Sequence, residues 1–195
     1  MKENNTMISK FNLPNKLTLI RIILTPILIL LMLFKYGFNH SILITILLHI
    51  LVVLLFATIA LTDFFDGYIA RRDNLVTNFG KLFDPIADKV FVFSVLIVLA
   101  KYNVFSIWLV LILLAREFVV MAIRMLILEN GGDVVPASPI AKLKTATQMG
   151  ALLFALIFPF GNFVNSVILL PSVIFSIISM LEYYEMVKKY LMEDM

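Results

Sequence analysis

The chain has 195 residues, of which 62% are hydrophobic and only 15% are charged, and its net charge is +3. A water-soluble domain of this length is nearer half apolar and a quarter charged, so the composition excludes an ordinary soluble domain and indicates an integral membrane protein. The absence of cysteine excludes disulfides and cysteine-based metal sites, and the modest net charge predicts no nucleic-acid partner.

Six apolar runs of membrane-spanning length follow one another along the chain. Residues 1–16 precede them and are polar and amphipathic, so we expect a membrane-surface segment followed by a six-helix domain over residues 17–195. The expected helices cover residues 17–35, 41–71, 81–101, 105–129, 139–159 and 165–187. Ser138 and Pro139 fit an N-cap and a first-turn proline for the fifth helix. The predicted fold class is all-α, a polytopic membrane protein with six transmembrane helices.

Basic residues are distributed unevenly between the two ends of these helices. If both termini lie in the cytoplasm, only Lys35 and Lys101 of the sixteen Lys and Arg residues fall toward the outer side. Cytoplasmic connections carry an excess of Lys and Arg, so this distribution predicts a multi-pass protein of the cell membrane with both termini inside. The connections over residues 72–80 and 130–138 then also face the cytoplasm. The high Ile, Lys and Asn content favours an AT-rich, bacterial genome.

The stretch of residues 62–89, TDFFDGYIARRDNLVTNFGKLFDPIADK, carries five of the thirteen acidic residues between two apolar runs. One pair of carboxylates stands three residues apart on the second expected helix, and another pair stands four apart on the third. These four residues are Asp63, Asp66, Asp84 and Asp88. Facing carboxylates repel one another unless cations bind, and oxygen ligands without nearby His or Cys suit Mg²⁺, Mn²⁺ or Ca²⁺. Asp73, beside Arg72 in the connection, is expected to be a solvated cap or ion pair.

Small residues and one arginine accompany these carboxylates. Gly67, Ala70 and Gly80 have little or no side chain, which would let a bulky group approach the backbone or would permit close helix packing. Arg71 offers a planar donor fork that suits phosphate. Together these residues predict a site for a phosphate ester. A cation transporter is the alternative from another class, but transporters favour ion sites near the membrane midplane, not at one face.

The pattern D-x2-D-G-x2-A-R-x8-G-x3-D-x3-D over residues 63–88 resembles the signature of the CDP-alcohol phosphotransferases. The resemblance implies six transmembrane helices, usually in a homodimer, and transfer of a phosphatidyl group from CDP-diacylglycerol to an alcohol with release of CMP. It implies Mg²⁺ or Mn²⁺, as two ions, held by Asp63, Asp66, Asp84 and Asp88. Of these four, Asp88 is also the implied general base. The positions that it implies along the CDP site are Gly67, Ala70, Arg71 and Gly80.

The stretch NLPNKLTLIR opens the first expected helix and places three polar residues on one helical face. These residues, Asn15, Thr18 and Arg21, are expected to take part in binding the donor. A capped, positively flanked helix start is the alternative interpretation.

Two later stretches, LAREFVVMAIR and SPIAKLKTATQ, contain more cations than the donor phosphates need. An arginine inside an apolar run is unfavourable unless it meets an anion. The cations are Arg116, Arg124, Lys142 and Lys144. Pairing of an arginine with an Asp or a Glu, or anchoring of the lysines at the membrane interface, would be purely structural alternatives. Spare cations predict a second anion, so we expect an acceptor alcohol that carries a phosphate.

Three stretches, NLPNKLTLIR, LAREFVVMAIR and SPIAKLKTATQ, resemble the branch of the family that makes phosphatidylglycerophosphate. The resemblance implies that sn-glycerol 3-phosphate is the acceptor and that the reaction takes place among membrane lipids. Branches that make phosphatidylserine, phosphatidylinositol phosphate or cardiolipin are the alternatives. The expected chemistry is direct displacement at the β-phosphorus of the donor, with Asp88 taking the proton of the acceptor hydroxyl.

Overall fold

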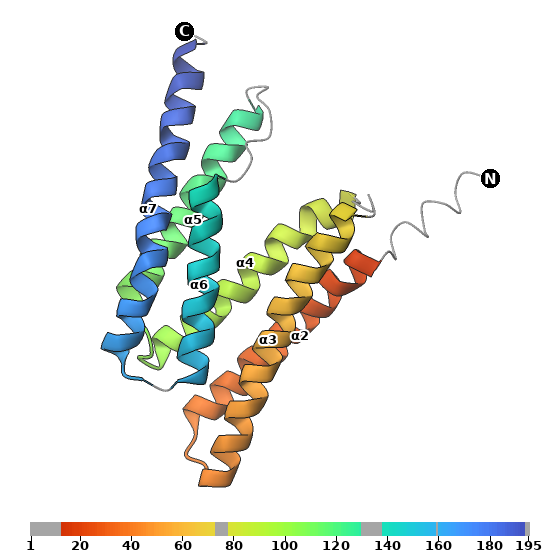
Figure 1. The fold of residues 1–195 in the computed structure, drawn as a ribbon, viewed down its shortest axis with the longest axis vertical. Helices are drawn as coiled ribbons and strands as arrows, with labels where there is room; N and C mark the ends of the chain where they lie inside the picture. The colour runs from red at the N-terminus through yellow and green to blue at the C-terminus, as the bar shows by residue number, and fades with distance from the viewer. Residues whose placement is uncertain (1–12, 73–77, 130–137, 159, 194–195) are drawn as a thin grey trace, which may run out of the picture. The chain divides into compact units, whose positions relative to one another are not determined.

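The computed structural model describes residues 13–72, 78–129, 138–158 and 160–193, with side chains described at residues 18–62, 86–127, 138–158 and 160–188. The described residues form six α-helices and no strand (Figure 1). This arrangement confirms the predicted all-α class. The chain divides into two compact units, residues 1–98 and 99–195, each of which is described by itself.

The first unit contains α2 (Leu13–Gly37), α3 (Ile42–Arg72) and most of α4 (Asn78–Lys101). Helices α2 and α3 pack against each other, joined by the short connection at residues 38–41. Near this connection, Lys35 Nζ lies 3.0 Å from Nδ1 of His49. The rings of Phe56 and Phe91, both buried, lie 5.2 Å apart and join α3 to α4. Both helices that carry the acidic motif therefore belong to this unit.

The second unit contains α5 (Ile107–Glu129), α6 (Pro139–Ile157), α7 (Asn162–Glu193) and the end of α4. Helix α7 packs against both α5 and α6. The predicted start of α6 is confirmed, because Oγ of Ser138 accepts a hydrogen bond from the Ala141 amide at 3.2 Å and Pro139 occupies the first turn. Tyr183 of α7 packs in an apolar cluster with three α5 residues, Val120, Ile123 and Ile127.

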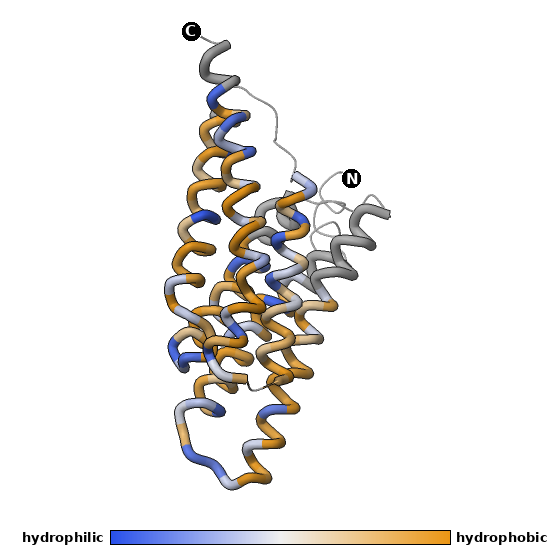
Figure 2. The backbone as a smooth tube through the Cα atoms, turned by 60° about the vertical axis from the view of Figure 1, so that its left-hand side comes forward, coloured by the Kyte–Doolittle hydropathy of each residue, from blue (hydrophilic) through white to orange (hydrophobic). Residues whose placement is uncertain are grey.

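Four described helical segments are long and apolar enough to cross a membrane. These segments are Thr18–Gly37, Ile42–Thr62, Pro139–Ile157 and Asn162–Lys188. Figure 2 shows hydrophobic residues along most of their length, and large side chains such as Ile42 and Phe163 are exposed, as expected where lipid is the neighbour. Charged residues at 116, 117 and 124 interrupt α5, and α4 is described with side chains only from residue 86. The protein is therefore a multi-pass membrane protein.

The six helices agree with the six predicted elements and differ from them mainly at their ends. Helix α2 begins at Leu13, where residue 17 was expected, and α7 runs over Asn162–Glu193 where 165–187 was expected. The predicted limits follow the apolar runs, but helical hydrogen bonding continues into polar sequence that contains good helix formers such as Glu, Lys and Met. Residues 1–12 of the predicted surface segment, and Asp73, lie outside the described residues.

Candidate functional site

The acidic motif occupies the end of α3 and the start of α4, as its spacing predicts. The structure places Asp63 and Asp66 within α3 and Asp84 and Asp88 within α4. Among the motif carboxylates, Asp88 alone has a described side chain, which is half-buried. The side chains of the other predicted donor and metal residues lie outside the described set, namely Asn15, Asp63, Asp66, Gly67, Ala70, Arg71, Gly80 and Asp84. Convergence of the four carboxylates stays a prediction.

The chemistry of this donor set fits a hard divalent cation. All four residues are carboxylates, and both histidines of the chain lie near the other end of α3. His49 there contacts Lys35, and His40 Nε2 lies 3.0 Å from the carbonyl oxygen of Phe34. Among the side chains that the structure describes, no three potential metal ligands come together, and three of the four carboxylates lie outside that set. An all-oxygen set of this kind would suit Mg²⁺ or Mn²⁺.

Two of the predicted donor-binding residues on α2 are buried. Thr18 and Arg21 are both almost fully inaccessible, and Arg21 is among the largest fully buried side chains. The carbonyl oxygen of Arg21 also accepts a hydrogen bond from Oγ1 of Thr25 at 2.8 Å. A buried guanidinium must be compensated by acceptors or anions. Of the three residues of the predicted common face of α2, Thr18 and Arg21 are therefore buried, and the side chain of Asn15 lies outside the described set.

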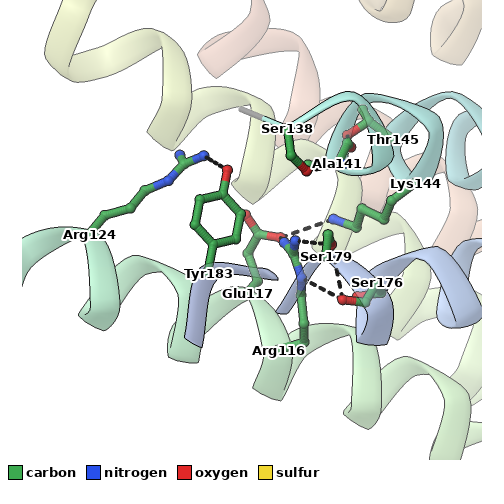
Figure 3. Close-up of polar contacts among 10 residues, drawn as sticks. All are labelled: Arg116, Glu117, Arg124, Ser138, Ala141, Lys144, Thr145, Ser176, Ser179 and Tyr183. Atoms are coloured by element: carbon green, nitrogen blue, oxygen red, sulfur yellow. Dashed lines mark hydrogen bonds and ion pairs between the residues drawn. The ribbon is translucent and has the colours of Figure 1, made fainter. Parts of the chain in front are cut away.

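In the second unit, two of the four predicted acceptor cations share one carboxylate. Oε2 of Glu117 accepts hydrogen bonds from Lys144 Nζ at 2.9 Å and from Arg116 Nη1 at 3.2 Å (Figure 3). Arg116 also donates from Nε to the main-chain carbonyl of Ser176 at 3.1 Å and from Nη2 to Oγ of Ser179 at 2.5 Å. We call Arg116, Glu117, Lys144, Ser176 and Ser179 the Glu117 cluster. It joins α5, α6 and α7.

Counted over its five described residues alone, the Glu117 cluster carries one net positive charge and has more hydrogen-bond donors than its internal contacts use. Its arginine and its lysine are balanced by one carboxylate, and the side chains of Arg116 and Lys144 are only 6% and 9% exposed. A guanidinium has five N–H donors and an ammonium has three. The contacts described use three donors of Arg116 and one of Lys144. Among the described residues, these contacts therefore leave two donors on each cation unused.

The other two predicted acceptor cations lie outside the Glu117 cluster. Arg124 donates from Nη2 to the hydroxyl of Tyr183 at 2.6 Å, and its guanidinium carbon lies 5.0 Å from the centre of that ring (Figure 3). The side chain of Lys142 is exposed. The structure thus brings Arg116 and Lys144 together and leaves Lys142 and Arg124 apart. The pairing of Arg116 with Glu117, which the sequence left open, is present.

Sequence reasoning missed the partners on α7. Ser176, Ser179 and Tyr183 contact the α5 arginines across about 60 residues of sequence, and local spacing does not encode such pairings. A signal is nevertheless present, because Ser172, Ser176, Ser179 and Tyr183 follow one another at steps of four, three and four in a run that is apolar elsewhere except at Glu182. Such steps place all four on one helical face.

Comparison with known proteins identifies the family. The family model of the CDP-alcohol phosphatidyltransferases matches residues 11–178. A CDP-diacylglycerol–glycerol-3-phosphate 3-phosphatidyltransferase of Bacillus subtilis is 40% identical over 189 residues, covering 89% of this chain and 94% of that protein. A protein of the same name from Rickettsia typhi is 42% identical over 185 residues, covering 92% and 98%. A probable phosphatidylglycerophosphate synthase of Mycobacterium tuberculosis is 39% identical over 141 residues, covering 72% and 64%. The chain belongs to the CDP-alcohol phosphatidyltransferase family.

Proposed function

We propose that this protein transfers the phosphatidyl group of CDP-diacylglycerol to sn-glycerol 3-phosphate, which gives phosphatidylglycerophosphate and CMP for phospholipid synthesis. The observation that carries this proposal is the similarity, over about nine-tenths of the chain, to relatives whose names state that reaction. The net positive charge of the Glu117 cluster supports an acceptor that carries its own phosphate.

The donor side of the proposed site is the acidic motif of α3 and α4. The family generally uses a divalent metal. We assign the metal ligands to Asp63, Asp66, Asp84 and Asp88, with two Mg²⁺ or Mn²⁺ ions. Bound metal would neutralise the diphosphate and the departing CMP. The proposed contacts to the rest of CDP-diacylglycerol are Asn15, Thr18, Arg21, Gly67, Ala70, Arg71 and Gly80.

The proposed chemistry is one displacement at the β-phosphorus of the donor. Asp88 accepts the proton of the acceptor hydroxyl as that oxygen forms a bond to the β-phosphorus. The bond from the β-phosphorus to the oxygen that bridges it to the cytidine side breaks, and CMP leaves with that oxygen. Catalysis then depends on holding the two substrates in line, since the protein itself forms no covalent bond.

We assign the acceptor phosphate to the cations of the second unit. Arg116 and Lys144 carry this assignment best, because they lie together, are nearly buried and retain donors. Lys142, one half-turn before Lys144 and exposed, would attract the anion from solvent. Arg124 would contribute from two turns further along α5. Hydrogen bonds between charged groups are stronger in such a buried, water-poor environment than at the protein surface.

The proposed setting is a bacterial cell membrane, crossed by all six helices. Residues 17–195 would form the catalytic domain behind the surface segment 1–16, with both termini and the site on the cytoplasmic side. The distribution of Lys and Arg supports this orientation. A homodimer is proposed on the family resemblance.

Release of CMP tests the proposed function. Purified protein should release CMP from CDP-diacylglycerol only when glycerol 3-phosphate and Mg²⁺ or Mn²⁺ are both present, and the lipid product should carry one additional phosphate relative to phosphatidylglycerol. Release that is equally fast without any acceptor would indicate a hydrolase and contradict the proposal. Release with another alcohol alone would assign the chain to another branch of the family.

A further inference from the structure

Helix α7 presents two fully buried hydroxyl groups, one helical turn apart, to two different arginines of α5. Ser179 and Tyr183 are both 0% exposed. Oγ of Ser179 accepts from Arg116 Nη2 at 2.5 Å, and the hydroxyl of Tyr183 accepts from Arg124 Nη2 at 2.6 Å (Figure 3). These are the shortest side-chain contacts that the two guanidinium groups make in the described part of the chain.

The hydroxyl of Ser179 is oriented by a hydrogen bond within its own helix. Its proton is directed to the carbonyl oxygen of Ser176 at 3.1 Å, which leaves its lone pairs for Arg116. That same carbonyl accepts from Arg116 Nε at 3.1 Å, so two points on α7 define the plane of the guanidinium. Ser172 on the same helix is equally buried, but its hydroxyl donates to the carbonyl of Leu169 and contacts none of the arginines whose side chains are described. Burial of a serine on α7 therefore does not by itself produce such a contact.

The position of the Tyr183 hydroxyl is set by packing. The ring belongs to the apolar cluster with Val120, Ile123 and Ile127 of α5. The Tyr183 ring therefore packs against α5, the helix that also carries Arg124. This packing fixes the position at which the Tyr183 hydroxyl accepts the hydrogen bond from Arg124. Nε of Arg124 is buried and makes no hydrogen bond to any residue that the structure describes, so within that set this guanidinium retains donor capacity.

We propose that Ser179 and Tyr183 are positioning residues that hold the guanidinium groups of Arg116 and Arg124 in the orientation that binds the acceptor phosphate. The inference rests on the proposed acceptor role of these two arginines. A long, flexible arginine loses conformational freedom when it binds an anion, and a guanidinium that is already fixed loses less. Neither hydroxyl is expected to touch a substrate.

Kinetics of hydroxyl-deletion variants test this inference. Ser179→Ala and Tyr183→Phe should each raise the KM for glycerol 3-phosphate about 3-fold to 10-fold. The KM for CDP-diacylglycerol should stay within about twofold, because the deleted bonds hold only acceptor cations. Ser179→Thr keeps a hydroxyl and should restore most of the acceptor affinity. Ser172→Ala and Tyr184→Phe are the matched controls on the same helix, and Tyr184 is 61% exposed; both should behave as wild type.

A purely structural role would give a different result. Lower thermal stability with both KM values unchanged would overturn the inference for the residue concerned, as would an equal rise in both KM values. If Ser179→Ala does not fold, Tyr183→Phe decides, because it keeps the ring and its packing. If the wild-type protein does not use glycerol 3-phosphate, the proposed function is contradicted. The positioning role is then decided with the phosphorylated alcohol that the protein does use, by comparing the changes in acceptor KM and donor KM that each variant causes.

Discussion

Replacing Glu117 by glutamine is the sharpest perturbation of the second unit, because this one carboxylate serves two cations. The substitution keeps the size of the side chain and removes its charge. Arg116 and Lys144 would then lie 6% and 9% exposed with no shared counterion. Two like charges held in a dry site repel each other, and each loses its ion pair.

The size of the effect follows from the burial of the three side chains. Removing one partner of a buried pair costs about 3–5 kcal/mol. Glu117 is 17% exposed, and Arg116 keeps its bonds to Ser176 and Ser179, so we expect the lower end of that range. For a chain of this length, a loss of about 3 kcal/mol lowers the Tm by about 6–12 °C. Lys144→Met should cost less, because it leaves Glu117 paired with Arg116.

Thermal unfolding in detergent measures this ordering. Glu117→Gln should have the lowest Tm, and the double variant Glu117→Gln/Lys144→Met should recover part of the loss, because it removes one of the two uncompensated cations. Glu185→Gln makes the same chemical change at an exposed position of α7 and serves as the control. A Glu117→Gln protein as stable as that control, or a double variant less stable than Glu117→Gln, would refute the reasoning.

Three further predictions concern turnover. Asp63→Asn, Asp66→Asn and Asp84→Asn should each abolish activity, and EDTA should stop the wild-type enzyme until Mg²⁺ or Mn²⁺ is returned; full activity in chelator would contradict the metal assignment. Asp88→Asn should lose at least about 10²-fold in kcat while still binding CDP-diacylglycerol, and a rate above about one-tenth of wild type would count against a general base. Arg116→Lys should raise the KM for glycerol 3-phosphate by roughly 10-fold or more, since a point charge cannot replace a planar fork, and an unchanged acceptor KM would remove Arg116 from the acceptor site.

Apolar periodicity and local capping predict most of the fold. Each of the six helices was expected at its place, and the Ser138 cap at the start of α6 was predicted from one dipeptide. Such features depend on residues that are close in the sequence, so a single amino-acid sequence is enough to predict them. The ends of α2 and α7 are harder to predict from the sequence, because helical hydrogen bonding extends beyond the apolar residues that mark a membrane span.

The candidate site was predictable only where its residues are neighbours in sequence. The acidic motif lies on two consecutive helices, so its spacing alone places its carboxylates on α3 and α4. The cluster around Glu117 depends on how three helices pack. Glu117 contacts Lys144, 27 residues away in the sequence, and Arg116 contacts Ser179, 63 residues away. The sequence therefore indicates that spare cations are present but not which of them lie close together. Lys142 and Lys144 are equivalent in composition, yet one is exposed and the other is buried against a carboxylate.

The central claim is that the acceptor alcohol carries a phosphate, and that Arg116 and Lys144 bind this phosphate. Competition between glycerol 3-phosphate, serine, inositol phosphate and free glycerol, in one assay with CDP-diacylglycerol and Mg²⁺, measures this most directly. We expect phosphatidylglycerophosphate to be by far the main product and free glycerol to react very slowly, because glycerol leaves Arg116 and Lys144 without their anion. Serine or free glycerol reacting as fast as glycerol 3-phosphate would contradict the claim.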